Sequence, residues 1–172
     1  KKAPAVIKAT GDALVKLSPD SIAPLAAVLN DYNDVYRRNA ENVLIKIGPP
    51  VYDAMLGKLS SSEKNDRESA ARVLGGINEP KAIGPLIEMF EDHTIAVRRA
   101  AAKAVAQYKN AALPQLTACV QDNLDNPLVL KQAAYALGLI GSAGAAAELS
   151  KMLGSNDPLV KEATARAMGY GA

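Results

Sequence analysis

The sequence is poor in the residues that most often build disulfide, metal or aromatic-rich folds. It has no tryptophan, one phenylalanine, one histidine and one cysteine among 172 residues. With Cys119 alone, an internal disulfide framework cannot form and a cysteine-based metal site lacks ligands. Few aromatics and many alanines disfavour a β-sandwich and favour closely packed helices. The composition therefore predicts an all-α protein without a bound metal.

The sequence also lacks a segment that could cross or be sent across a membrane. No apolar run approaches the ~20 residues that span a bilayer, and no signal peptide is visible. We therefore expect a cytoplasmic protein with no membrane partner. Because the chain starts at Lys1 rather than methionine, we also expect that an upstream segment has been removed.

Charge is nearly balanced, with 20 basic and 18 acidic residues and a net charge of +2. Such a balance does not indicate a dedicated nucleic-acid binder, although it leaves room for a local basic patch.

What the sequence does contain is an internal repeat. The segment from Val97 to Ala106 recurs with changes along the whole chain, and each copy has a small residue at its centre. Successive centres are separated by 30, 30, 31, 32 and 31 residues. These six anchors are Thr10, Ala40, Ala70, Ala101, Ala133 and Thr164.

The columns around the anchors have helical periodicity. Positions four before, four after and seven after each anchor are mostly apolar, and they share one face of a helix, which we call helix B. Asn126-Pro127 and Asp157-Pro158 are typical helix starts, and Gly48 and Gly141 are placed to end helices. A second apolar stretch between successive B helices predicts a helix A in each repeat.

The fold prediction is an α–α superhelix of stacked antiparallel helix pairs, in which neighbouring pairs share one core. We expect a single domain over residues 1–172. Neither end has a polar capping helix, so we expect either that the array continues beyond the chain or that something else covers its ends. Its repeats are predicted at residues 1–18 (partial), 19–48, 49–78, 79–109, 110–141 and 142–172.

Several copies resemble the short HEAT-like repeats found in bacteria, archaea and phycobilisome lyase subunits, a family of armadillo-type solenoids. That family's helix B reads approximately Asp-x-x-Val-Arg-x-x-Ala-x-x-Ala-Leu-Gly-x-Ile-Gly. The matching residues are Val97, Arg98, Ala101, Ala104 and Val105; Ala133, Ala136, Leu137, Gly138, Ile140 and Gly141; and Asp157, Val160, Ala167, Met168 and Gly169. Leu130 and Ile7 depart from the arginine column, so we expect a regular hydrogen-bond ladder to be interrupted at these two positions.

The resemblance implies that the B helices line a concave face. Two positions on the side of helix B away from each anchor are richer in basic than in acidic residues. The predicted partner-binding residues are Arg38, Asn42, Arg72, Arg99, Lys103, Lys131, Tyr135 and Arg166. An acidic or phosphate-bearing partner would suit this row, although exposed helix faces also carry charge for solubility alone.

No residue pattern indicates a catalytic centre. His93 lies in a predicted surface turn without a second nitrogen ligand, and Cys119 lies on an apolar helix face. The sequence therefore predicts a non-catalytic, cofactor-free scaffold that holds a protein partner. Two alternatives stay open: a nucleic-acid-binding solenoid that uses the same basic row, and an accessory subunit of an enzyme resembling the bilin lyases.

Overall fold

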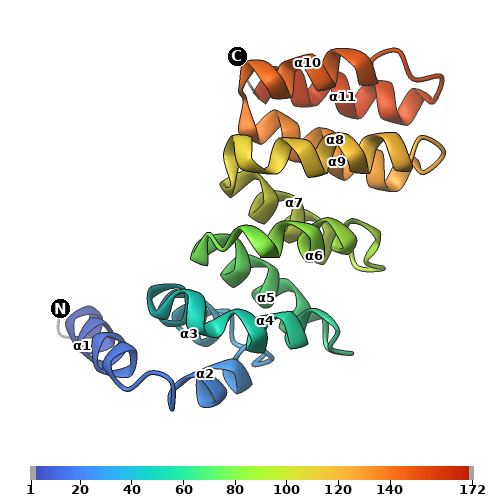
Figure 1. Cartoon of the computed structure of the whole chain (residues 1–172). Helices are drawn as coiled ribbons and strands as arrows, with labels where there is room; N and C mark the ends of the chain where they lie inside the picture. The colour runs from blue at the N-terminus through green and yellow to red at the C-terminus, as the bar shows by residue number, and fades with distance from the viewer. Residues whose placement is uncertain (1–2, 171–172) are drawn as a thin grey trace. The chain divides into compact units, whose positions relative to one another are not determined.

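The computed structural model describes residues 3–170, and for residues 3–8 and 170 it describes the backbone alone. Within residues 3–170 the regular elements are eleven α-helices and four 3-10 helices, with no strand. The prediction of an all-α fold is confirmed (Figure 1). None of these helices combines the length and apolar character that crossing a bilayer requires.

The helices alternate between the two predicted kinds. The B helices are α1 (Ala3–Lys16), α3 (Asp34–Ile47), α5 (Lys64–Ile77), α7 (Ile95–Gln107), α9 (Pro127–Ile140) and α11 (Pro158–Tyr170). The A helices are shorter: α2 (Ile22–Val28), α4 (Tyr52–Leu59), α6 (Ile83–Glu88), α8 (Leu113–Asp122) and α10 (Ala143–Met152). Short 3-10 helices extend three of the A helices, at η1 (Pro49–Val51), η2 (Pro80–Ala82), η3 (Met89–Glu91) and η4 (Lys109–Ala112).

The chain divides into two compact units, Lys1–Glu79 and Pro80–Ala172. In the first unit, α1 packs on α3 and α3 on α5, while α2 and α4 pack against the B helix that follows each. In the second, α7 packs on α9 and α9 on α11, and α6, α8 and α10 pair with them in the same way. The unit boundary lies one residue from a predicted repeat boundary. One domain over residues 1–172 stays a prediction.

The anchors of the repeat form the core, as predicted, in five of six copies. Ala40, Ala70, Ala101, Ala133 and Thr164 are all buried, and four of these five are completely inaccessible to solvent. Small side chains at these points let neighbouring helices approach closely, which explains the abundance of alanine.

The expected core is wrong at some positions near the ends of the array. Thr10 is exposed, because no A helix precedes α1 among the described residues to cover that face. Leu17, Tyr36 and Met168 are also exposed. Two further expected core residues, Val6 and Gly171, lie outside the described side chains.

The predicted helix ends are confirmed. The Asn126 side chain accepts a hydrogen bond from the Val129 N–H, and Asp157 accepts from the N–H groups of the first turn of α11. Gly48 and Gly141 end α3 and α9 with φ of 81° and 62°, a region that favours glycine. Asn78 ends α5 in the left-handed conformation, an end that the sequence analysis did not identify.

A recurrent hydrogen bond fastens three of the five turns between helices A and B to the B helix. An arginine of helix B donates Nη1–H to a backbone carbonyl six residues earlier, over 2.5, 2.8 and 2.6 Å. The donor and acceptor pairs are Arg37 and Asp31, Arg67 and Ser61, and Arg98 and Asp92. No such bond is found at Leu130, where leucine cannot donate, so the sequence correctly identified that gap.

Arg67 gives a test of this ladder. It is almost fully buried, and the same Nη1 also lies 2.9 Å from the Ser62 carbonyl oxygen. Replacement of Arg67 by lysine should destabilise the protein by about 1 kcal/mol, because a flexible lysine stem does not fix its ammonium between the two carbonyls as the rigid guanidinium fixes Nη1. Urea unfolding measures the loss. The exposed Lys64→Arg exchange on the same helix should change stability by less than about 0.5 kcal/mol.

Candidate functional site

Five of the eight predicted partner-binding residues meet around one cavity in the second unit, which we call the basic cavity. Its volume is about 320 Å³, and α7, α9 and α11 each contribute to its lining. The five residues are Arg99, Lys103, Lys131, Tyr135 and Arg166. They converge because the two residues on α7, and likewise the two on α9, are four positions apart and share a helix face.

The basic cavity carries positive charge that the protein does not neutralise. Arg99, Lys103 and Lys131 are exposed, and none forms an ion pair with any residue in the described part of the chain. Arg166 pairs with Glu162, which lies one turn earlier on α11 and does not line the cavity. No carboxylate is among the lining residues, so the site favours an anion.

A buried polar group faces the same space. Gln132 lines the cavity, is 6% exposed, and makes no side-chain hydrogen bond within the described residues. Its amide lies beside three unpaired cations and is therefore available to a polar ligand in the cavity. The small side chains of Ala163 and Ala167 leave room for it.

The predicted partner-binding arginines of the first unit differ from those of the basic cavity, because acidic side chains pair with them. Arg38 is paired with Asp34 over 2.7 Å, and this hydrogen bond lowers the pKa of the Asp34 carboxyl. Arg72 is paired with Glu41 over 3.2 Å and also with Glu68. Asn42, exposed on α3, carries no charge. The basic row that the sequence predicts is therefore neutralised here.

Two residues of these surfaces are not among the predicted ones: Glu41, which neutralises Arg72, and Gln132, which lines the basic cavity. Both are buried on B helices next to an anchor, in columns occupied mainly by small residues. Glu41 follows its anchor where four of the other five copies have alanine and the first has glycine. A polar residue in such a column is the signal that could have identified them.

The other chemical candidates have no catalytic features. Burial raises the pKa of the Cys119 thiol to about 11, with smaller contributions from the carboxylates of Asp122 and Glu91. The thiol is thus protonated at neutral pH and a poor nucleophile. His93 is exposed, with Nδ1 3.9 Å from Asp92 Oδ1. Within residues 3–170, no three metal-ligating side chains come together.

Comparison with known proteins identifies relatives among lyases. The chain is 33% identical over 101 residues to the phycocyanobilin lyase subunit beta of Thermosynechococcus vestitus, covering 58% of this chain and 47% of that protein. It is 32% identical over 99 residues to the phycocyanin alpha phycocyanobilin lyase CpcF of a Synechocystis species, covering 57% and 46%. The chain thus spans about half the length of the curated relatives it matches.

A solved structure has the same fold. A chain from the complex of CpcE and CpcF of phycocyanin lyase from Nostoc sp. PCC7120 superposes with a TM-score of 0.62 at 23% identity. The superposition covers 87% of this chain and 98% of that one.

The relatives correct one prediction. We expected no enzymatic role, and that expectation is contradicted because both curated relatives are named as a lyase or a lyase subunit. A sequence indicates an enzyme most clearly when acids, bases and nucleophiles stand in a known motif, and this sequence has no such motif. The residues of the basic cavity come instead from three B helices of successive repeats.

The sequence pattern of HEAT repeats matches residues 52–126 and 110–169, which together cover more than half of the chain. The same residues form the helix hairpins and buried anchors described above. The chain therefore belongs to the HEAT repeat family.

Proposed function

We propose that the chain is a subunit of a lyase-type enzyme that acts on an open-chain tetrapyrrole, and that the basic cavity holds acidic groups of this chromophore. The proposal is supported by the kinship with two phycocyanobilin lyase proteins. Its structural support is the convergence of three unpaired cations and the Gln132 amide on one cavity.

The chemistry of the cavity suits carboxylates. Phycocyanobilin carries two propionate groups, which are anions at neutral pH. Arg99 offers a planar fork for one carboxylate, Lys103 and Lys131 offer point charges, and Gln132 offers an amide N–H. With about 320 Å³, the cavity is at the lower end of the range for ligand sites, so it would take the propionate edge and leave the remaining chromophore accessible.

A protein partner is the second part of the proposal. The related solved structure is a complex of two different chains, CpcE and CpcF. By analogy with that complex, a second, different chain would complete the enzyme. A cytoplasmic location belongs to the same proposal.

The nucleic-acid alternative has less support. A polynucleotide offers phosphates at regular intervals and is held by a continuous row of cations. Here Arg38 and Arg72 are neutralised by acidic neighbours, and the unpaired cations of the predicted row all line one cavity. This distribution favours a compact anionic group over an extended phosphate backbone.

Charge reversal in the basic cavity tests the proposal. Wild-type chain mixed with phycocyanobilin should shift the visible absorption of the bilin and induce circular dichroism in its bands. The double variant Arg99→Glu, Lys103→Glu should bind about tenfold or more weakly, because two charge-assisted contacts become repulsive. The dissociation constant comes from a titration followed by either signal.

The matched control is Lys64→Glu with Lys161→Glu, which changes net charge equally at exposed residues outside the cavity. Both residues are near helix N-termini, where glutamate is tolerated. This control should bind like wild type. Binding that is absent in wild type, or equal in all three proteins, would reject the proposal.

A further inference from the structure

One of the turns between helices A and B departs from the pattern of the others, and the departure involves two residues together. In four repeats the turn has a polar residue whose side chain accepts a hydrogen bond from the N–H two positions later. In three of these four, an arginine six positions after that residue donates to its carbonyl oxygen, and the last repeat has Lys161 at that position. Between α8 and α9 the corresponding residues are Leu124 and Leu130. Both polar elements of the turn are thus replaced by leucine in the same repeat.

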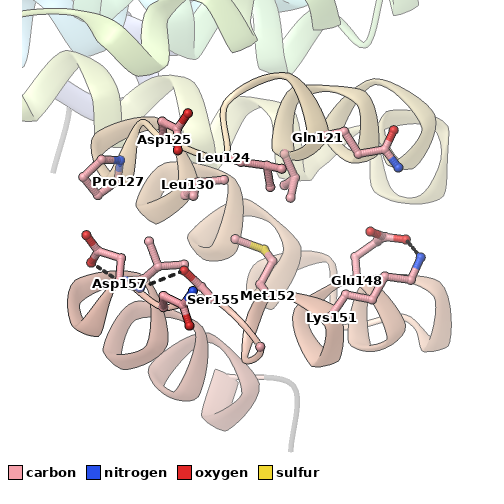
Figure 2. Close-up of a pocket in the computed structure, with 14 residues that line it drawn as sticks. Gln121, Leu124, Asp125, Pro127, Leu130, Glu148, Lys151, Met152, Ser155 and Asp157 are labelled. Atoms are coloured by element: carbon pink, nitrogen blue, oxygen red, sulfur yellow. Dashed lines mark hydrogen bonds and ion pairs between the residues drawn. The ribbon is translucent and has the colours of Figure 1, made fainter.

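The two leucines line a groove, which we call the leucine groove. Its volume is about 630 Å³, about twice that of the basic cavity, and it lies between the α8–α9 turn and the α10–α11 hairpin. Leu130 is buried in its floor, whereas Leu124 is 68% exposed. Figure 2 shows both on the α8–α9 side, opposite Met152 on α10. An aliphatic side chain placed in the groove would contact all three.

Acidic groups surround this apolar floor. Asp125, Glu148 and Asp157 line the groove, and Lys151 is the one lysine or arginine in its lining. Lys151 is paired with Glu148 over 2.6 Å, and Figure 2 shows this pair at one end and Asp157 near the other. Asp125 is exposed and unpaired within the described part of the chain. The groove thus has the opposite charge preference to the basic cavity.

We propose that the leucine groove docks a segment of a partner protein in which an aliphatic side chain is flanked by lysine or arginine. The aliphatic side chain covers Leu124 and rests on Leu130 and Met152, and the flanking cations face Asp125 and Asp157. Charge complementarity selects this occupant over an acidic segment and over an anionic small molecule. The site is independent of the tetrapyrrole proposed for the basic cavity.

Nuclear magnetic resonance of the full chain, with labelled methyl groups, tests the proposal. The probe is a blocked pentapeptide of sequence glycine-lysine-leucine-lysine-glycine. It should shift the methyl resonances of Leu124, Leu130 and Met152. Peptides with alanine in place of leucine, or glutamate in place of both lysines, should bind about tenfold or more weakly.

A double variant, Leu124→Asp with Leu130→Arg, separates binding from folding. It recreates the polar turn found at Asp31 and Arg37, and again at Asp92 and Arg98, with the same spacing of six residues. It should therefore fold as stably as wild type, while the new side chains remove the apolar floor. The Met152 methyl should then no longer respond to the leucine peptide.

Three results would overturn the proposal. Equal shifts with the alanine or glutamate peptide would show that neither the aliphatic group nor the charge is recognised. An unchanged Met152 response in the double variant would place binding elsewhere. Shifts of the same methyls with protein concentration, in the absence of peptide, would assign the groove to a second copy of this chain.

Discussion

Replacement of Lys58 by methionine is expected to destabilise the first unit by about 3 kcal/mol, because it leaves a buried carboxylate without its counter-charge. Lys58 Nζ lies 2.8 Å from Asp66 Oδ2, and the Ser61 hydroxyl donates to the same oxygen over 2.9 Å. The Asp66 side chain is 6% exposed. Its second oxygen, Oδ1, has no hydrogen-bond partner among the described residues, so the hydroxyl of Ser61 would be left as the main support for the charge.

Removal of both partners should restore most of that loss. Asp66 stands four residues before an anchor, where the three repeats of the second unit have valine, at Val97, Val129 and Val160. The double variant Lys58→Met, Asp66→Val should therefore lie within about 1 kcal/mol of wild type, since an apolar pair can replace a buried ion pair at little cost. Urea unfolding of the two single variants and the double variant gives the coupling free energy.

An exposed ion pair of the same unit is the control. Lys46 Nζ lies 3.4 Å from Asp12 Oδ1, and both side chains are about half exposed. Lys46→Met should change the free energy of unfolding by less than about 1 kcal/mol, because water already solvates these charges. Similar losses for Lys58→Met and Lys46→Met would contradict the role assigned to burial.

Replacement of Gly138 by alanine is expected to loosen the contact between α9 and α11. A Cβ at residue 138 would lie 2.6 Å from the Ala167 carbonyl oxygen and 2.9 Å from the Ala167 Cα. These are backbone atoms, so no side-chain rotation relieves the overlap and the helices must move apart. Overpacking costs about 1–3 kcal/mol, whereas alanine gains about 1 kcal/mol of helix propensity. Because the overlapping atoms are backbone, the cost should lie in the upper part of that range, for a net loss of about 1–2 kcal/mol.

At Gly57, replacement by alanine should stabilise the protein instead of destabilising it. It lies in α4, and a Cβ built there meets nothing within 4 Å. Gly57→Ala should therefore stabilise the protein by about 0.5–1 kcal/mol through helix propensity alone. Amide hydrogen exchange should show faster exchange in α9 and α11 for Gly138→Ala and no change there for Gly57→Ala. If the amides of α11 exchange as slowly in Gly138→Ala as in wild type, the close backbone contact is disproved.

Most of the helix arrangement could be predicted from the repeat alone. An anchor that recurs every 30 to 32 residues, with apolar residues four positions away, specifies both the helical period and the face that must leave water. The same alignment located the missing arginine at Leu130. It failed near the chain's ends, at Thr10 and Met168, because a repeat pattern does not indicate whether a neighbouring hairpin is present to cover the face.

The sequence by itself determined the hairpin fold and the faces of the B helices, since both follow from local periodicity and the burial of apolar side chains. Tertiary structure decided which of the charged residues on those faces stay unpaired. Arg72 is neutralised by Glu41, 31 residues away on the neighbouring B helix, whereas Arg99, Lys103 and Lys131 converge on a cavity without a carboxylate. The physical reason is that an ion pair requires contact within about 4 Å, and the packing of adjacent helices sets which side chains come that close.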